Sequence, residues 1–398
     1  MDGIITGSDQ RAAQEWRPFF VMVKPVAAAC NLACRYCYYL NRPGMSASHR
    51  MTREVLEVLI RDAIAAQPGT PEIHFAWQGG EPTLAGIDFF REALALQERY
   101  RPAGTMIVNA LQTNGTLLDE GWAQFFSEHR FLIGISIDGP AAVHDPLRRD
   151  AGGRTTHAKV LRGLRELQRA GVQYNALTVV HNLNYRQGRA VYRFLRRIGV
   201  IHMQFIPLVE RMTGSGGLAA PPPADPGTQT APWTVPPEGL GRFLCDVFDD
   251  WLAHDVGRIF VQAIEEHVAA LVRRPAGVCT FGYDCSSSPM IEANGDVYSC
   301  DHFAFSAYRL GNLLRTPIVD LVRSARLHEF GRMKREGLPE ECAQCPFLAA
   351  CYGGCTKHRF VAAPGGGMKN YLCPSYRRFF SHTAPALAAF VAMAAGSA

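Results

Sequence analysis

The feature that most constrains the fold of this chain is the placement of its cysteines. Of the 12 cysteines in 398 residues, all but Cys245 fall into a group of three near the N-terminus and a longer array in the last third of the chain. In a cytosolic protein, clustered cysteines more often bind metal or act in redox chemistry than form disulfides. The fold must therefore bring separate cysteine segments close enough to share metal centres.

The first group has the spacing C-x3-C-x2-C and consists of Cys30, Cys34 and Cys37. Three thiolates can hold three irons of a [4Fe–4S] cube and leave the fourth iron without a protein ligand. Such an open position can bind a small molecule, as catalytic metal sites do and closed structural sites do not. A zinc half-site and chance clustering are the alternatives to this interpretation.

The later array supplies enough thiolates for two fully ligated [4Fe–4S] clusters. Its members are Cys279, Cys285, Cys300, Cys342, Cys345, Cys351, Cys355 and Cys373. Two tetrahedral zinc sites of the ribbon type would use the same number of cysteines, and the spacing does not show which cysteines share a site. The remaining Cys245 lies on the apolar face of a predicted helix and is interpreted as a core residue.

Apolar runs alternate with helical patterns in the first half of the chain, as in βα units around a parallel sheet. Predicted strands begin the stretches 19–26, 72–82, 106–115, 131–139, 172–180 and 201–207, and predicted helices cover 54–66, 86–100, 119–128, 157–170 and 186–198. Six such units favour a barrel-like or open α/β sheet, whose chemistry lies at the carboxyl ends of the strands. The cysteine loop, GGEP, QTNG, SIDG and FIPLVE all follow such strand ends.

Composition predicts the domain boundaries. The barrel is expected over residues 18–212, a Pro- and Gly-rich loop over 213–237, and a helical linker over 238–278 with helices at 238–254 and 259–273. From Cys279 onward the regular periodicity fades, so a cysteine-rich domain is expected over 279–380. Residues 381–398 form the C-terminal tail, and the apolar segment that begins just inside it predicts a docked helix.

Charge and hydropathy exclude several other classes of protein. The net charge is +5, from 41 basic and 36 acidic residues, and gives no case for nucleic-acid binding. Residues 1–16 are polar and predict no signal peptide. The apolar segment near the C-terminus, about 12 residues long, is too short to cross a bilayer. We therefore expect a cytoplasmic protein without a membrane partner.

Longer stretches make the pattern specific: CNLACRYCYYL together with WQGGEPTL, and MQFIPLVER. With Tyr36 before the third cysteine and Asp301 directly after Cys300, they resemble the anaerobic sulfatase-maturating enzymes of the radical S-adenosylmethionine (radical SAM) superfamily. The resemblance covers about residues 18 to 380. It implies an α/β fold: a partial (βα)6 TIM-like radical SAM barrel, a SPASM domain (a cysteine-rich extension with two auxiliary clusters) and a C-terminal helix.

The resemblance also implies a reaction, the oxidation of a sulfatase cysteine or serine to Cα-formylglycine. A side-chain base cannot break an unactivated C–H bond at neutral pH, so a cofactor radical must do so. The first cluster would cleave SAM, the 5′-deoxyadenosyl radical would take a hydrogen atom from Cβ, and auxiliary clusters would accept the second electron. By the family pattern, the three [4Fe–4S] clusters are bound by Cys30, Cys34 and Cys37; by Cys279, Cys285, Cys300 and Cys355; and by Cys342, Cys345, Cys351 and Cys373.

Asp301 is the candidate catalytic base, because a base must lie within hydrogen-bond reach of its proton and this residue adjoins a cluster ligand. His302 is a weaker rival. The resemblance implies SAM contacts from Tyr36, Gly80, Ser136, Arg148 and Val209, and substrate contacts from Tyr39 and Gln78. Gly80 would allow close backbone approach, and the planar fork of Arg148 suits a carboxylate.

The implied partners are an unfolded or nascent sulfatase segment and a flavodoxin- or ferredoxin-type reductant. One alternative is a SPASM maturase that forms thioether or carbon–carbon crosslinks in a ribosomal peptide, although residues 1–17 hold no evident peptide-docking domain. The alternative from another class is a zinc-stabilised binding protein, which would carry zinc in place of about twelve irons. The sequence does not distinguish a serine target from a cysteine target, and it does not show the oligomeric state.

Overall fold

The computed structural model of the protein describes residues 18–39, 50–221 and 227–396. The expectation that residues 1–16 hold no signal peptide lies outside these ranges, as do residues 222–226 of the predicted loop and the last two residues of the tail. In the described ranges, no helix is both long enough and apolar enough to cross a membrane.

Six parallel strands form the centre of one curved sheet, which confirms the predicted α/β class. They are β1 (Val21–Val23), β2 (Glu72–Trp77), β3 (Met106–Thr113), β4 (Leu132–Ser136), β5 (Tyr174–Val180) and β6 (His202–Pro207). Each strand pairs in parallel with the next one along the chain. β1 is shorter than the predicted stretch 19–26, because Pro25 has no N–H to donate and Ala27 turns the chain with a φ of 49°.

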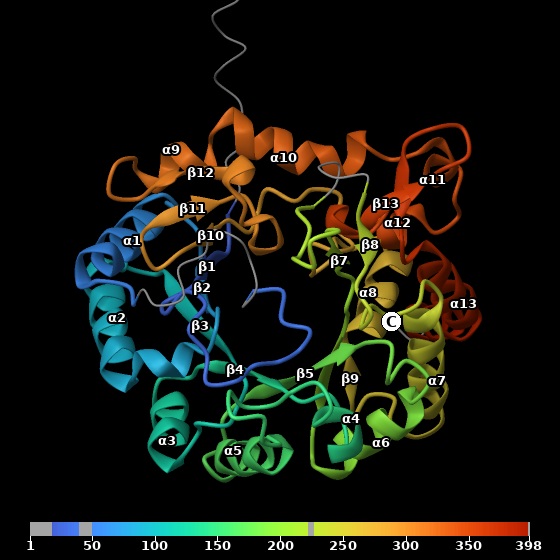
Figure 1. Ribbon diagram of the computed structural model, residues 1–398, viewed down its shortest axis with the longest axis horizontal. Coiled ribbons are helices and arrows are strands. Elements are labelled where there is room, and N and C mark those ends of the chain that lie inside the picture. The colour runs from blue at the N-terminus through green and yellow to red at the C-terminus, as the bar shows by residue number, and fades with distance from the viewer. Residues whose placement is uncertain (1–17, 40–49, 222–226, 397–398) are drawn as a thin grey trace, which may run out of the picture.

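The connecting helices cover the outer face of this sheet (Figure 1). They are α1 (Arg53–Ala65), α2 (Ile87–Tyr100), α3 (Glu120–Glu128), α5 (His157–Arg169) and α6 (Gly188–Arg197), with a short additional helix, α4 (Ala141–His144). α1 buries Leu56, Leu59 and Ile60 against the sheet, at the spacing that predicted it. With the outer face covered, the loops that follow the strands are left to form the site.

Further strands extend the sheet at both edges. β10 (Met290–Ile291) pairs in parallel with β1, and β11 (Asp296–Tyr298) and β12 (Arg309–Asn312) follow in antiparallel order. β9 (Phe260–Val261) pairs with β6 at the other edge. Short strands therefore follow Cys279, in the region where the sequence shows little periodicity. These strands are two to four residues long, too short for an alternating pattern to reveal them.

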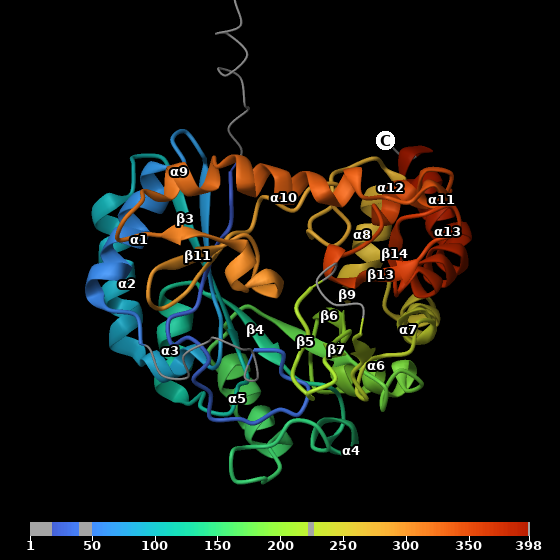
Figure 2. The same ribbon diagram turned by 45° about the horizontal axis from the view of Figure 1, so that its top comes forward.

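The C-terminal half also contains most of the remaining helices and strands. They are β7 (Arg211–Met212), β8 (Gln229–Thr230), α7 (Gly239–His254), α8 (Gln262–Leu271), α9 (Ile318–Val322), α10 (Ala325–Glu336), α11 (Glu340–Ala343), α12 (Leu348–Cys351), β13 (Arg359–Ala362), β14 (Met368–Asn370) and α13 (Cys373–Gly396). α13 packs on α7 and α8 and runs through residue 380 without a break. Figure 2 shows α10 running from the barrel side of the molecule toward α11 and α12.

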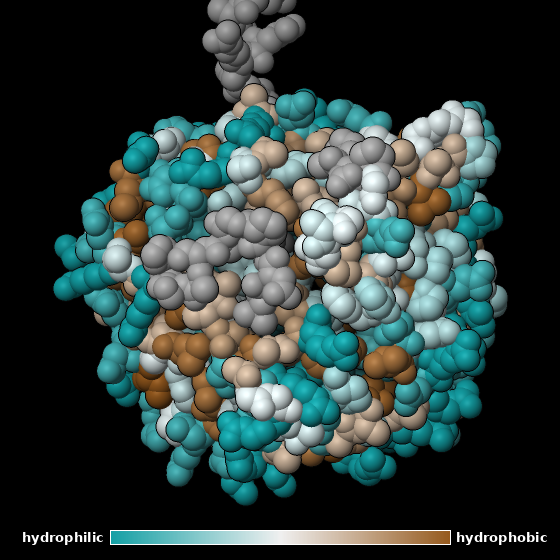
Figure 3. All heavy atoms as spheres, in the orientation of Figure 1, coloured by the Kyte–Doolittle hydropathy of each residue, from teal (hydrophilic) through white to brown (hydrophobic). Residues whose placement is uncertain are grey.

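The side chains of α7 contribute to the apolar core, and Cys245 is buried there as predicted. Phe243, Phe248 and Cys245 of α7 are all buried. On the polar side of α6, Arg193 forms an ion pair with Asp250 of α7, with 2.8 Å between Nε and Oδ2. On the face shown in Figure 3, apolar residues lie in small groups among hydrophilic ones.

Packing of α13 gives a first testable prediction. Phe379 is 1% exposed against α7 and α8, whereas Phe390 of the same helix is 36% exposed. Phe379→Ala should cost about 3–5 kcal/mol of stability, because a large buried ring leaves a cavity. Anaerobic thermal unfolding should show a clearly lower Tm for Phe379→Ala and a small change for the control Phe390→Ala. Equal effects would contradict the packing described.

Candidate active site and cysteine clusters

The first cysteine group lies on the loop that follows β1, and two neighbouring segments hold this loop in place. Backbone N–H groups of Ala33 and Arg35 donate to the carbonyls of Arg149 and Leu147, at N···O distances of 2.8 and 2.9 Å. Within the loop, the N–H of Cys37 donates to the carbonyl of Cys34 at 3.0 Å. The loop is thus anchored to the segment after β4, where Arg148 was predicted to contact a cofactor.

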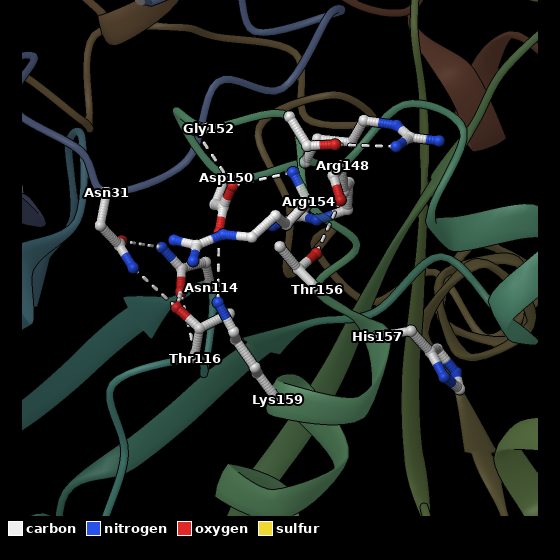
Figure 4. Close-up of polar contacts among 12 residues, drawn as sticks. Asn31, Asn114, Thr116, Arg148, Asp150, Gly152, Arg154, Thr156, His157 and Lys159 are labelled. Atoms are coloured by element: carbon white, nitrogen blue, oxygen red, sulfur yellow. Dashed lines mark hydrogen bonds and ion pairs between the residues drawn. The ribbon is translucent and has the colours of Figure 1, made fainter.

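Polar groups converge on the sulfur of Cys30. The N–H of Leu32 lies 3.3 Å from its Sγ, and Nδ2 of Asn114, just past β3, lies 3.8 Å from it. Asn114 also donates to Oδ1 of Asn31, and Asn31 donates to Oγ1 of Thr116, both at 2.8 Å (Figure 4). These donors suit a thiolate more than a neutral thiol.

Burial raises the pKa of the Cys30 thiol to about 12, against the opposing effect of the Leu32 hydrogen bond. At neutral pH such a thiol keeps its proton until a metal displaces it, so ligation and deprotonation would occur together. The donor set of three thiols on one anchored loop fits a cluster with one open iron.

The GGEP segment after β2 lies directly against this loop. Gly80 donates its N–H to the carbonyl of Ala27 at 2.9 Å, and Glu81 donates to that of Ala29 at 2.8 Å. A Cβ on Gly80 would lie 1.9 Å from the Ala29 carbonyl oxygen, so this position can hold only glycine without backbone movement. This steric requirement explains why a glycine stands at position 80, and its contact with SAM stays a prediction.

Glu81, from the same motif, is a residue whose structural importance the sequence analysis missed. Its buried carboxylate accepts hydrogen bonds from Oγ1 of Thr83 and Thr113 and from the N–H of Asn114, each at 2.7 Å. Burial raises the pKa of Glu81, and these hydrogen bonds oppose the rise. The carboxylate ties the end of β2 to the end of β3 and so positions Asn114 beside Cys30.

Tyr36, Arg148 and Asp138 form a buried polar chain on the other side of the cysteine loop. Nη1 of Arg148 donates to the Tyr36 hydroxyl at 2.8 Å, and that hydroxyl donates to Oδ2 of Asp138 at 2.7 Å. The Nε of Arg148 is buried and has no hydrogen-bond partner among the described residues. A buried guanidinium with an unused donor fits an anionic or hydroxyl-rich ligand.

The other predicted cofactor residues lie at nearby strand ends. Leu208, just past β6, packs with Tyr36 and Leu147 in a small apolar cluster, whereas the side chain of the adjacent Val209 packs into the main core. Ser136 ends β4 and is 8% exposed. The structure thus brings Tyr36, Arg148 and the Leu208 segment together around one side of the cysteine loop.

Asp301 begins a short 3-10 turn (Asp301–Phe303) directly after Cys300, where it meets the first cysteine loop. The hydroxyl of Tyr38, one residue past Cys37, donates to Oδ2 of Asp301 at 2.8 Å. Nζ of the buried Lys24 lies 3.8 Å from the same oxygen. His302, the predicted rival, instead has its ring edge-on to Tyr38, 5.4 Å away between centroids.

The two predicted substrate residues lie in different environments. Tyr39 is 2% exposed and its hydroxyl donates to Oε1 of Glu292, with Lys24 4.7 Å above its ring. Gln78 follows β2 and is partly buried, with its N–H donating to the carbonyl of Val23 at 2.9 Å. Their role in substrate contact stays a prediction.

The structure separates the later cysteines into two groups. The thiols of Cys279, Cys285, Cys300 and Cys355 interact electrostatically with one another. Cys342, Cys345, Cys351 and Cys373 line one cavity between α11, α12 and α13. These are the same two sets of four that the family pattern implies. Each set draws its members from more than one segment of the chain.

The chemistry of both sets fits multi-iron clusters. Burial raises the pKa of Cys285 to about 12 and those of Cys279 and Cys351 to about 11. In the described residues, no three metal-binding side chains converge tightly enough for a single metal ion. A cube holds each thiolate on a different iron, so its ligands need not meet at one point.

Several residues around Asp301 were not predicted. Lys24 could have been recognised from the sequence, because it is a charged residue at the end of an apolar strand. Buried charges in proteins are paired, so a partner for it could have been expected. The contact of Tyr38 could not have been recognised, because its position beside Cys37 does not show that its hydroxyl reaches Asp301. Asp138 was quoted in the SIDG motif, but its contact with Tyr36 depends on the fold.

Two family models match the chain. The first, the radical SAM superfamily, covers residues 25–195, and the second, the SPASM iron–sulfur cluster-binding domain, covers residues 283–346. Both matched segments contain cysteines of the groups described above.

Curated relatives match over almost the whole chain. A serine-type anaerobic sulfatase-maturating enzyme of Bacteroides thetaiotaomicron is 41% identical, over 93% of this chain and 90% of its own length. The serine-type enzyme of Klebsiella aerogenes is 39% identical, over 92% and 85%. A cysteine-type enzyme of Clostridium perfringens strain ATCC 13124 is 31% identical, over 93% and 97%.

Solved structures agree with these relatives. Native anSMEcpe with bound AdoMet and Cp18Cys peptide superposes with a TM-score of 0.83 at 30% identity, covering 94% of this chain and 99% of that one. Streptococcus suis SuiB bound to precursor peptide SuiA gives a TM-score of 0.63 at 16% identity, over 90% and 76%. The second likeness shows a shared fold alone.

The contact between Gly80 and the cysteine loop gives a second prediction. Gly80→Ala should displace the loop and weaken SAM binding at least tenfold, because the new methyl group overlaps the Ala29 carbonyl. The control is Gly214→Ala, where a Cβ would meet no atom within 4 Å. Equilibrium dialysis of SAM against the anaerobically reconstituted variants checks this, and unchanged binding by Gly80→Ala would contradict the geometry.

Proposed function

Since this chain belongs to the anaerobic sulfatase-maturating enzymes and is a radical SAM enzyme, we propose that it oxidises one side chain of a sulfatase segment to Cα-formylglycine. One contact carries the proposal: Tyr38, next to Cys37, donates a hydrogen bond to Asp301, next to Cys300. A substrate side chain in this region would lie near both the group that removes its hydrogen atom and the group that removes its proton.

The cofactors would divide among the residues as the sequence predicted. When bound, SAM and three [4Fe–4S] clusters supply the 5′-deoxyadenosyl radical that takes a hydrogen atom from Cβ and the acceptor for the second electron. Cys30, Cys34 and Cys37 would hold the cluster that binds SAM. Gly80 and Arg148, together with Tyr36, Ser136 and the Leu208–Val209 backbone, would hold SAM beside it.

Asp301 would remove the proton from the substrate hydroxyl or thiol. It is 9% exposed, so its carboxylate is largely shielded from water. Tyr38 and Lys24 both approach its Oδ2 and fix its orientation. Positioned general bases contribute about 10²- to 10⁴-fold to rate. Tyr39, two residues past Cys37, and Gln78, directly after β2, would contact the substrate peptide.

We infer further that the target residue is serine. The chain is 41% and 39% identical to serine-type relatives but 31% and 30% identical to cysteine-type relatives of similar coverage. Loss of a hydrogen atom, an electron and the hydroxyl proton converts serine directly to the aldehyde. The same losses from cysteine give a thioaldehyde, which water must still hydrolyse.

The proposed partners follow from this reaction. The substrate would be an unfolded or nascent sulfatase segment, because only an extended chain can reach strand ends inside a curved sheet. A flavodoxin- or ferredoxin-type protein in the cytoplasm would supply the electron that cleaves SAM. Crosslinking of a ribosomal peptide stays the alternative function.

The role of Asp301 gives the third prediction. Asp301→Asn keeps the size of the side chain but removes its basic oxygen, so aldehyde formation should fall by about 10²- to 10⁴-fold while SAM cleavage continues. Mass spectrometry of the peptide and chromatography of 5′-deoxyadenosine measure the two steps. Cys30→Ala is the control that should lose both. Normal aldehyde yield from Asp301→Asn would refute the base assignment.

The target residue gives the fourth prediction. Two peptides that differ at one position, serine or cysteine, should both be tested, and the serine peptide should be converted faster. The product should lose two hydrogens and react with a hydrazide, as an aldehyde does. Faster conversion of the cysteine peptide would contradict the serine inference. A mass loss without hydrazide reactivity would favour a crosslinking function instead.

A further inference from the structure

Two cations are buried between the later cysteine groups. Arg359 begins β13 and is 6% exposed, and Lys334 lies near the end of α10 and is 0% exposed. Removing a charged group from water costs several kcal/mol unless a partner of opposite charge compensates it. A guanidinium does not lose its proton in a protein, so the charge of Arg359 is permanent. The site that surrounds it must supply the compensating anion.

The direct contacts of these cations are neutral carbonyls. Arg359 donates from Nη1 to the carbonyl of Lys334 and from Nη2 to that of Tyr352, both at 2.7 Å, and from Nε to that of Gly353 at 3.2 Å. Lys334 donates from Nζ to the carbonyls of Cys279 and Thr280. These contacts engage some of the donors of both cations, but none of them supplies a negative charge.

The turn that receives Arg359 connects the two cysteine groups. Cys351 and Cys355, at its two ends, belong to different groups, and Tyr352, Gly353 and Gly354 between them all have positive φ, of 41°, 72° and 62°. This backbone turns two carbonyls toward the guanidinium. A Cβ on Gly353 would lie 2.7 Å from Nη2 of Arg359, so glycine is what lets the cation come this close.

Cysteine thiols surround these cations, and they become thiolates when a metal displaces their protons. Arg359 interacts electrostatically with Cys285 and Cys355 of one group and with Cys342 and Cys351 of the other. The corresponding partners of Lys334 are Cys285, Cys355 and Cys279, all from one group. In the described part of the chain, neither cation forms an ion pair with a carboxylate, whereas the buried Lys24 has Asp301 at 3.8 Å. The two cations are therefore positioned to compensate the negative charge of clusters bound at the cysteine sites.

The charge of a four-thiolate cube changes on reduction. Such a cube carries a net charge of roughly −2 when oxidised and roughly −3 when reduced, and nearby charge and hydrogen bonds set its potential. A fixed cation in a medium of low dielectric constant stabilises the more negative state. It therefore raises the reduction potential and makes the cube a better electron acceptor.

We propose that Arg359 and Lys334 are the built-in counter-charges that raise the reduction potentials of the two auxiliary clusters, with Arg359 acting on both. The inference rests on the proposed function for the identity of the acceptor. The carbon radical left on serine Cβ loses one electron and its hydroxyl proton, forming the C=O bond. The proton would go to Asp301, and an auxiliary cluster bound by the later cysteines would accept that electron. Arg359 and Lys334 would stabilise the negative charge gained there.

The test measures potentials in the full chain without using the catalytic reaction. In a Cys30→Ala/Cys34→Ala/Cys37→Ala background, electron paramagnetic resonance during a redox titration reports the auxiliary clusters alone. Arg359→Met and Lys334→Met should each lower the midpoint potential of an auxiliary cluster. At a fixed solution potential, the ratio of reduced to oxidised cluster should fall at least tenfold, which equals about 59 mV for one electron. Arg359→Lys keeps the charge but not the three-carbonyl clamp, and it should retain most of the potential.

Controls separate a charge effect from damage to the fold. Arg193→Met removes an arginine that pairs with Asp250 between α6 and α7, and it should leave both potentials unchanged. Iron and sulfide are counted for every variant. Unchanged potentials in iron-replete Arg359→Met and Lys334→Met would overturn the proposal, and so would loss of iron from both variants. If Arg359→Met alone loses iron, Lys334→Met decides the outcome.

The outcome is independent of the proposed function. Lowered potentials in variants of a chain that makes no aldehyde would support the counter-charge role and reject the maturase function. If the chain forms the aldehyde but its cluster potentials do not change when either cation is removed, the maturase function is supported and the counter-charge role is rejected.

Discussion

The parallel pairing of β10 with β1 is the interaction on which the site depends. β1 leads into the first cysteine loop, and β10 leads through the β11 hairpin strand to Cys300 and Asp301. Backbone hydrogen bonds from Phe20 to Ser287 and from Lys24 to Ile291, both at 2.9 Å, fix the register between segments more than 260 residues apart. Without this register, Tyr38 and Lys24 would not meet Asp301. A sheet edge, which is otherwise a liability, is here used to join two chemical regions.

Several buried charges in the site have specific partners. Glu81 accepts hydrogen bonds from the ends of two strands, Asp138 receives the Tyr36 hydroxyl, and Lys24 faces Asp301. Arg148 keeps one unused donor toward the region beside the first cysteine loop. A buried polar network that lacks a partner costs free energy, so an unused donor in it indicates where a ligand is expected. Around the later cysteines, the same reasoning makes the cluster thiolates the expected partners of the Arg359 charge.

The barrel could be predicted from the sequence because its helices are long and amphipathic. The helices α1 to α3, α5 and α6 lie within two residues of their predicted ranges, since burial of one face imposes a 3.6-residue period on each of them. The edge strands β9 to β12 could not be predicted, because two to four residues show no period. Asp301 could be chosen as a candidate base because it stands beside Cys300 in the sequence. Its contacts with Tyr38 and Lys24 could not be predicted, because they depend on the fold.

The sequence by itself identified the candidate metal-binding cysteines and showed that three of them lie in one short segment, because local spacing decides which ligands share a turn. It could not assign Cys355 by spacing, since that residue follows Cys342, Cys345 and Cys351 yet joins Cys279, Cys285 and Cys300 in space. The family resemblance implies that grouping, and the tertiary structure places the Cys355 thiol near those of Cys279 and Cys300. A cube accepts one ligand per iron from any direction, so its four ligands are chosen by packing and backbone turns and not by order along the chain.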